Sequence, residues 1–176
     1  GSYAYVATSD QGLQVIDISD PQNPNIISSV SIGNSSYSVN ISGSYAYVGT
    51  TAGLKIIDIS DLHNPTTIAS VDDVGNAFSI DIVGSYLYIA NSDLVILNIS
   101  DPQNPQKIGF LHTRSIATEV SVSGAYSYIA DGNDNVGDTH KVDIRDLENL
   151  SITCSIPSNN GPSTVFASSS YVYAGD

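Results

Sequence analysis

Short segments in which polar and apolar residues alternate recur along the whole chain of 176 residues. In one unit, Ser36–Ser42 alternates with period two and Tyr45–Thr50 is rich in aromatic and β-branched residues, both of which are typical of strands. After a turn, Leu54–Ile59 is a nearly continuous apolar run, which suits a strand covered on both faces, and Thr67–Val71 is expected to form a weaker outer strand. No stretch keeps an apolar period of about 3.6 residues. The pattern predicts an all-β protein built from units of four short strands.

The unit is repeated along the chain. Ten of the eleven tyrosines lie in Tyr-x-Tyr pairs that recur at steps of 42, 41, 40 and 45 residues: Tyr3/Tyr5, Tyr45/Tyr47, Tyr86/Tyr88, Tyr126/Tyr128 and Tyr171/Tyr173. A second motif, Asp-Ile-Ser-Asp or a close variant, follows each of the first four pairs and begins at Asp17, Asp58, Asn98 and Asp143. Four strands in 40–45 residues is the spacing of a β-propeller blade, whereas solenoid repeats of about 20–29 residues are shorter. The repeat therefore predicts a β-propeller of four-stranded blades.

Two segments make the repeat more specific. Residues 12–21 (G-L-Q-V-I-D-I-S-D-P) and 53–61 (G-L-K-I-I-D-I-S-D) resemble the LVIVD-repeat family, and the Tyr-x-Tyr-(Val/Ile)-(Ala/Gly) segments before them fit it too. The resemblance extends over essentially the whole chain. It implies a propeller fold on a secreted, surface-attached or periplasmic prokaryotic protein. It implies no catalytic residues, because the family signature is structural.

The register of the repeat predicts where blades begin and end, if the first strand of each blade is the innermost one. Complete blades are expected over residues 36–75, 76–114 and 115–161, flanked by partial blades over 1–35 and 162–176. We therefore expect residues 1–176 to form one propeller segment, truncated from a larger ring. Its partners would include missing blades or neighbouring domains of the same protein. In the alternative, a closed four-blade ring, residues 170–175 would duplicate residues 2–7.

The repeated residues themselves are expected to support the fold. The Asp of each motif stands at a strand end, where its side chain can bond nearby backbone N–H groups; a ring of metal ligands is the alternative. Paired tyrosines share one strand face and are expected to pack in the core, with a carbohydrate-stacking surface as the alternative. Nine aliphatic side chains are expected to pack the blade faces: Val15, Ile16, Ile18, Ile56, Ile57, Ile59, Val95, Ile96 and Ile99.

Charge and composition exclude several classes of protein. The chain has 18 acidic and five basic residues, with a net charge of −13. Such a surface repels phosphate backbones, so no nucleic-acid partner is expected. No run of about 18 apolar residues predicts a membrane span. A single cysteine, Cys154, excludes an intrachain disulfide.

Binding sites are expected where the copies differ, because scaffold positions are shared between repeats. Between the second and third strands, the fourth copy inserts a polar segment over residues 131–140. Its candidate ligand-binding residues are Asp131, Asn133, Asp134, Asn135, Asp138 and His140. Oxygen-rich side chains suit Ca²⁺, which Asp131, Asp134 and Asp138 could bind. The match to an EF-hand loop fails, and an ordinary acidic surface loop is the alternative.

A second candidate lies on the innermost strands. Asp81 and Glu119 are the only carboxylates at the positions expected to face a central channel. Two carboxylates on adjacent blades could exchange protons with a substrate or hold a cation, and solvated channel lining is the alternative. The sequence shows no Ser-His-Asp arrangement, phosphate loop or CxxC motif. No catalytic residue and no cofactor other than calcium is therefore predicted.

Two classes of function remain. The first is a non-enzymatic extracytoplasmic interaction or scaffold module, which would bind a protein, glycan or matrix ligand through variable loops. The alternative is a secreted propeller enzyme, lactonase-like or hydrolase-like, with a site at the central channel. Such an enzyme needs ionisable residues from several blades, and the sequence supplies carboxylates from two.

Overall fold

The fold is all-β, as the alternating pattern predicts. A computed structural model of the chain describes residues 2–133, 136–158 and 161–175. Among these residues, every regular element is a strand and none is a helix. The chain divides into two compact units, one of Gly1–Ala77 with Pro102–Asn104, the other of Phe78–Asp101 with Pro105–Asp176.

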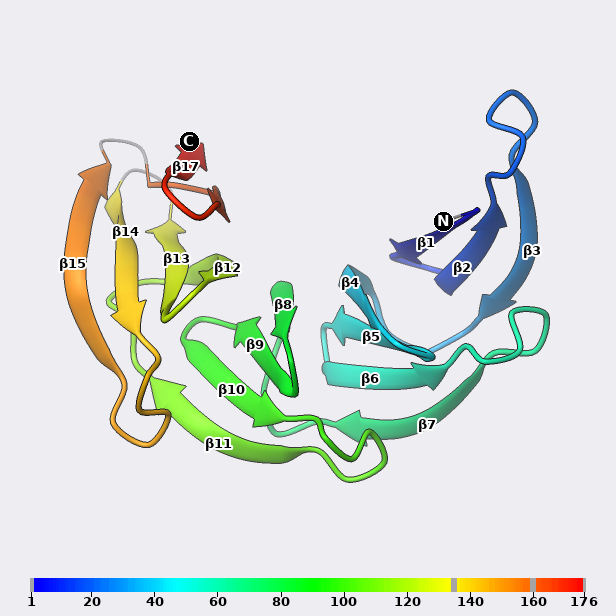
Figure 1. The fold of residues 1–176 in the computed structure, drawn as a ribbon, viewed down its shortest axis with the longest axis horizontal. Helices are drawn as coiled ribbons and strands as arrows, with labels where there is room; N and C mark the ends of the chain where they lie inside the picture. Colours follow the sequence, from blue (N-terminus) through cyan, green and yellow to red (C-terminus); the bar gives the residue numbers. More distant parts are fainter. Residues whose placement is uncertain (1, 134–135, 159–160, 176) are drawn as a thin grey trace. The chain divides into compact units, whose positions relative to one another are not determined.

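The first unit contains two antiparallel sheets in which strands that follow one another in sequence pair (Figure 1). One has three strands, in the order β1-β2-β3, and the other has four, in the order β4-β5-β6-β7. Their bounds are β1 (Tyr3–Thr8), β2 (Gly12–Asp17), β3 (Asn25–Val30), β4 (Ser36–Ser42), β5 (Tyr45–Thr50), β6 (Gly53–Asp58) and β7 (Thr66–Val71). The four strands predicted between Ser36 and Val71 agree with β4–β7 to within one residue at each end.

The second unit repeats this arrangement. It has two four-stranded antiparallel sheets, β8-β9-β10-β11 and β12-β13-β14-β15, and a two-stranded sheet, β16-β17. The bounds are β8 (Ser79–Val83), β9 (Tyr86–Ala90), β10 (Leu94–Asn98), β11 (Gln106–Leu111), β12 (Ala117–Ser123), β13 (Tyr126–Asn133), β14 (Val136–Asp143), β15 (Ser151–Ser158), β16 (Thr164–Ala167) and β17 (Val172–Gly175). Each four-stranded sheet is a meander, as in a propeller blade, and none of the described sheets closes into a barrel.

Aliphatic and aromatic side chains pack the faces between successive sheets. In the second unit, Tyr88 and Ile96 of one sheet join Val120, Ile129 and Val142 of the next in one buried cluster. Seven of the nine predicted aliphatic core residues are buried. The two others are Ile16, which is half-buried, and Ile18, which is 37% exposed. Their counterparts Ile57 and Ile59 pack with Leu13 of the preceding sheet, and within the described residues no sheet precedes that of Ile16.

The two tyrosines of a pair have different environments. The second tyrosine is buried in two complete sheets, with Tyr47 2% and Tyr88 3% exposed. This burial raises the pKa of both phenols above the ordinary value. The first tyrosine lies at the strand start, and Tyr86 is 38% exposed. The prediction of core packing is confirmed for Tyr47 and Tyr88. It is wrong for four exposed tyrosines: Tyr3, Tyr86, Tyr171 and Tyr173.

The Asp of the repeated motif caps the end of the third strand. Asp58 Oδ1 accepts a hydrogen bond of 2.8 Å from the backbone N–H of Ser60. Asn98 fills this position in the next copy and accepts the same bond from Ser100, at 2.9 Å. Hydrogen bonding by Ser60, through its side chain and backbone, lowers the pKa of Asp58. The prediction of a structural role for this residue is confirmed.

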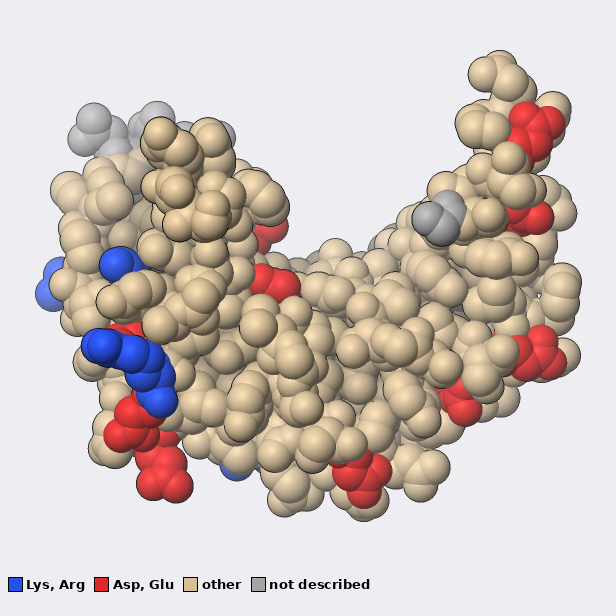
Figure 2. Space-filling model, viewed as in Figure 1, with Lys and Arg blue, Asp and Glu red and all other residues tan. Residues whose placement is uncertain are grey.

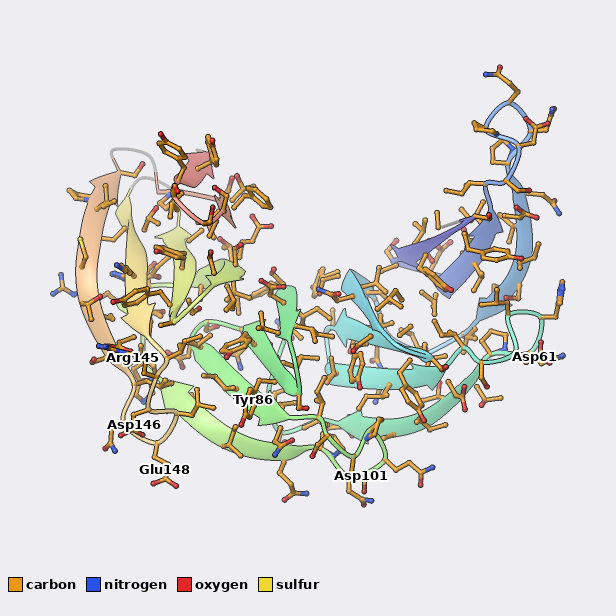
Figure 3. All side chains as sticks on the ribbon, in the orientation of Figure 1. Asp61, Tyr86, Asp101, Arg145, Asp146 and Glu148 are labelled. Carbon is orange, nitrogen blue, oxygen red and sulfur yellow. The ribbon has the colours of Figure 1, made fainter. Side chains whose placement is uncertain are left out.

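A second Asp of the motif shapes the turn into the outer strand. Asp61 Oδ1 accepts from the N–H of His63 at 3.0 Å, and its Oδ2 accepts from Asn64 Nδ2 at 2.9 Å. Figure 3 shows Asp61, Asp101 and Asp146 at the turns between the third and fourth strands of three sheets. These turns are built from local side-chain hydrogen bonds, as the sequence predicts.

Truncation of a buried tyrosine should destabilise the fold far more than truncation of its exposed neighbour. We expect Tyr88→Ala to lower the free energy of unfolding by about 3–5 kcal/mol, because it leaves a cavity in the cluster that joins two sheets. Tyr86→Ala is the matched control and should cost less than about 1 kcal/mol. Urea unfolding followed by circular dichroism measures both, and equal costs would contradict the assignment.

Loss of the Asp58 cap should lower stability in a pH-dependent way. We expect Asp58→Ala to lower the Tm by about 2–4 °C at pH 7, the size of one lost hydrogen bond in a domain of this length. Asp58→Asn should stay near wild type, because Asn98 makes the same bond.

The acid dependence follows from the lowered pKa of Asp58. Its ionised form stabilises the folded state above its ordinary pKa of 3.8, and that contribution is lost as the pH falls through the lower folded-state pKa. The Tm difference between wild type and Asp58→Ala should therefore shrink between about pH 5 and pH 2. Thermal scans across this range test it, and a difference that does not change with pH would count against it.

Candidate functional site

Residues 131–133 and 136–140 lie in paired strands, so the prediction of a loop is wrong for them. β13 and β14 continue their antiparallel pairing through Asp131 opposite Asp138 and Gly132 opposite Gly137. The backbones come close here, since a Cβ atom on Gly137 would lie 2.2 Å from Asp131 O. Asp, Asn and Gly are depleted in strands, which is why the composition pointed to a loop. The fourth sheet therefore carries an extended hairpin.

Asp131 is a buried anchor at the base of this hairpin. It is 1% exposed, and its Oδ2 accepts hydrogen bonds from the backbone N–H groups of Arg114 and Ser115, at 2.9 and 3.1 Å. These two residues belong to the connection that leads into β12. The carboxylate thus ties the hairpin to the start of its own sheet.

His140 extends this network to the outer strand. Its Nε2 lies 2.9 Å from Asp131 Oδ2 and its Nδ1 lies 2.8 Å from Ser155 Oγ. Because an ionised carboxylate only accepts hydrogen bonds, Nε2 carries a proton, and in the neutral imidazole Nδ1 accepts from the Ser155 hydroxyl. The interpretation that the chain has no Ser-His-Asp arrangement is wrong: Asp131, His140 and Ser155 form one, here called the buried triad.

The buried triad has the hydrogen-bond connectivity of a hydrolytic Ser-His-Asp triad, but its imidazole is not accessible to a substrate. A general base must later return its proton to a leaving group, so the imidazole must reach the substrate. His140, on β14, is 0% exposed, while Ser155 stands on the exposed outer strand β15. This geometry holds three strands together and leaves the imidazole shielded from any bound substrate.

The other residues of the predicted hairpin site are only partly described. Asp138 is half-buried on β14, opposite Asp131. Asn133 ends β13, while Asp134 and Asn135 lie outside the described residues. Across the part of the chain that the structure describes, no group of three or more His, Cys, Asp or Glu side chains is placed to hold a metal ion.

The two inner-strand carboxylates bond to the next sheet. Asp81 Oδ2 accepts from the N–H of Val122 at 2.7 Å, and Glu119 Oε2 accepts from the N–H of Val165 at 2.8 Å. Ser121 Oγ, two residues along β12 from Glu119, accepts from another N–H of β16 at 3.0 Å. Each carboxylate therefore joins the first strands of successive sheets.

Two of the basic side chains form ion pairs with nearby carboxylates. Figure 2 shows acidic residues in separate groups, with basic residues beside some of them. Lys55 pairs with Asp72 at 2.9 Å, and Arg145 pairs with Asp143. Hydrogen bonding by Arg145 lowers the pKa of Asp143 to about 2.

These features define a class of protein: a segment of four-stranded antiparallel blades joined by side-chain hydrogen bonds. The LVIVD repeat matches residues 1–31, 33–73, 74–113 and 115–136, and the chain belongs to this repeat family. No curated protein matches it. Within the described residues, no helix has the length and apolar content needed to cross a bilayer.

Two solved structures share the fold at low sequence identity. The computationally designed Ika8 protein aligns with a TM-score of 0.73 and 12% identity, over 99% of this chain and 52% of its own. A chain from an S. cerevisiae complex of Dbp5 with Nup159, Gle1, IP6 and ADP aligns with a TM-score of 0.59 and 12% identity, over 93% of this chain and 46% of its own. The chain thus spans about half the length of these structures.

Removal of Asp131 should strongly destabilise the fourth sheet. We expect Asp131→Ala to cost about 3–5 kcal/mol, because it leaves two backbone donors and His140 buried without their acceptor. The double variant Asp131→Ala with His140→Leu should cost less than the sum of the single variants, since both remove the same interaction.

Asp138→Ala is the control on the same hairpin and should change stability by no more than about 0.5 kcal/mol. Urea unfolding measures wild type, the two single variants, the double variant and Asp138→Ala, five proteins in all. A wild-type midpoint for Asp131→Ala would refute the anchoring role.

Proposed function

We propose that this protein is a non-enzymatic, extracytoplasmic interaction module that binds a protein, glycan or matrix ligand through its variable loops. The family resemblance motivates the extracytoplasmic setting. The inner-strand carboxylates support a scaffold role, because Asp81 and Glu119 each accept a backbone hydrogen bond. Each of these carboxylates is therefore part of the joint between two sheets, which is a structural use of an ionisable side chain.

The observation that carries the proposal is the extended β13–β14 hairpin. In the sister hairpin, β5 and β6 stop pairing at Thr50 opposite Gly53, whereas β13 and β14 pair on to Asn133 opposite Val136. The buried triad holds the base of this extension. An element on a rigid base loses little conformational entropy when it binds, which favours recognition.

The alternative, a secreted hydrolase or lactonase, is favoured by one observation. The Ser155 hydroxyl lies within hydrogen-bond distance of a histidine that is itself paired with a carboxylate. Hydrolysis of p-nitrophenyl acetate and of an aromatic lactone tests it directly. The interaction module predicts no rate above background, whereas turnover that disappears in Ser155→Ala would establish the enzyme.

Shortening the hairpin should abolish binding and preserve the fold. In the test variant, residues 132–138 are replaced by Thr-Ala-Gly, the three residues that stand between Thr50 and Leu54 in the sister hairpin. Surface plasmon resonance over collagen, fibronectin and neutral polysaccharides, with and without millimolar Ca²⁺, compares it with wild type. We expect wild type to bind one of these probes and the shortened variant to lose at least tenfold in affinity.

Glu148→Gln provides a matched control, because Glu148 lies in the β14–β15 turn at the other end of the same sheet and points away from it (Figure 3). It should bind like wild type. Equal binding by the shortened variant, or no binding of any probe by wild type, would contradict the proposal. A Ca²⁺ requirement that is lost with the hairpin would assign the predicted cation to it.

A further inference from the structure

A cavity of about 410 Å³ lies in the first unit, beside the second sheet. Its walls come from the connection between β3 and β4, from β6 and from the outer strand β7 (Figure 1). Ser31, Ile32, Lys55 and residues 67–70 line it. We call it the Lys55 pocket. Its volume falls in the range of small-ligand sites, about 300–1,000 Å³.

The pocket opens on a face of the sheet that is already covered by a neighbour. Lys55 lies directly opposite Val48 across β5 and β6, so the two side chains share one face. Val48 packs in a buried cluster with Leu13 of the preceding sheet. The cavity is therefore a gap within a packed junction of two sheets.

The gap arises at a position where the copies of the repeat differ. Lys55 pairs with Ser70 across β6 and β7. In the next sheet along the chain, Val95 and Phe110 occupy the corresponding pair of positions, and in the fourth sheet part of the buried triad does. A serine in place of the phenylalanine ring leaves space beside Lys55. Binding sites are expected at such variable positions, because the shared ones maintain the scaffold.

One positive and one negative charge lie side by side at this pocket. Lys55 Nζ lies 2.9 Å from Asp72 Oδ1, and the two side chains are 15% and 68% exposed. A simple anion would have to displace Asp72 and approach a chain with a net charge of −13. A simple cation would be repelled by Lys55. A ligand that carries both charges and no net charge avoids both penalties.

The spacing of the two charges matches that of an α-amino acid. In such a molecule the ammonium nitrogen and the nearer carboxylate oxygen lie about 2.7 Å apart, from standard bond lengths and angles. The carboxylate can therefore contact Lys55 while the ammonium group contacts Asp72, and the ion pair of the protein need not break. The apolar part of the wall, which includes Ile32 and Ile68, suits an aliphatic side chain.

We propose that the Lys55 pocket binds a free α-amino acid with an aliphatic side chain. Its carboxylate contacts Lys55 Nζ, its ammonium group contacts the Asp72 carboxylate, and its side chain packs beside Ile32 and Ile68. The pocket belongs to the first unit and the extended hairpin to the second. It is therefore a second binding site, beyond the function proposed above.

Isothermal titration calorimetry with L-leucine tests the ligand class. Isocaproate, which is leucine without its ammonium group, is the control for the anion alone. Isoamylamine, which is leucine without its carboxylate, is the control for the cation alone. We expect wild type to bind L-leucine at least tenfold more tightly than either control. No binding of L-leucine, or equal binding of isocaproate or isoamylamine, would overturn the proposal.

Two variants taken from the sister sheets locate the site. Lys55→Gln introduces the residue that Gln14 supplies at the corresponding position of β2, so it should fold and bind L-leucine roughly 10–100-fold more weakly. Ser70→Phe introduces the residue that Phe110 supplies on β11, and it should lose at least tenfold in affinity because the ring fills the cavity.

Lys107→Gln is the matched control, because it removes a cation of the second unit that lies over the Phe110 ring, and it should bind L-leucine normally. Circular dichroism checks that each variant is folded. Wild-type affinity in folded Lys55→Gln or in folded Ser70→Phe would refute the site. The hairpin-shortened variant should keep its affinity for L-leucine, so the outcome is independent of that of the hairpin experiment.

Discussion

Backbone N–H groups along the first strand of each sheet are the constraint on which the arrangement of these blades depends. Such a strand has a partner on one side only, and the N–H groups on its other side must find acceptors. In the second unit the acceptors are side chains on the first strand of the preceding sheet. Asp81 accepts a hydrogen bond from the N–H of Val122, and Glu119 accepts one from the N–H of Val165. Side chains two residues apart point the same way, so Ser121 repeats the contact made by Glu119. The intervening residue, Val120, is buried in the core between sheets. The alternation of polar and apolar residues on these strands is the consequence.

This constraint also limits what the inner strands can do. A carboxylate that accepts a short bond from a backbone N–H is part of the joint between two sheets, and its loss leaves a donor unpaired. Chemistry at these positions would therefore compete with the cohesion of the sheets. Residues outside these joints carry no such conflict. They can differ between copies while the joints are kept, as the extended hairpin of the fourth sheet illustrates.

Local chemistry accounts for what the sequence could predict. The strands between Ser36 and Val71 follow from period-two alternation, and the Asp58 and Asp61 turns from side chains that reach N–H groups two residues away. The rest depends on register and on distant contacts. His140 meets Ser155 only because β14 and β15 pair with these two residues opposite each other. Asp131 accepts a hydrogen bond from the N–H of Arg114, 17 residues earlier in the chain. No local sequence pattern predicts either contact. The different burial of the two tyrosines of a pair, such as Tyr86 and Tyr88, likewise depends on how far the neighbouring sheet covers the start of their strand.

The departures of the fourth sheet from its sisters come together on β14. His140 and Lys141 are neighbours there, and their side chains point to opposite faces of the sheet. The same two positions on β10 hold Val95 and Ile96, which are fully buried. On β14 one face is polar and closed, because His140 bonds to both Asp131 and Ser155. The other face carries Lys141, whose Nζ lies 3.6 Å from the centroid of the Tyr126 ring. Polar side chains are tolerated on both faces of β14 because each has a partner of its own, whereas on β10 both faces are packed by apolar neighbours.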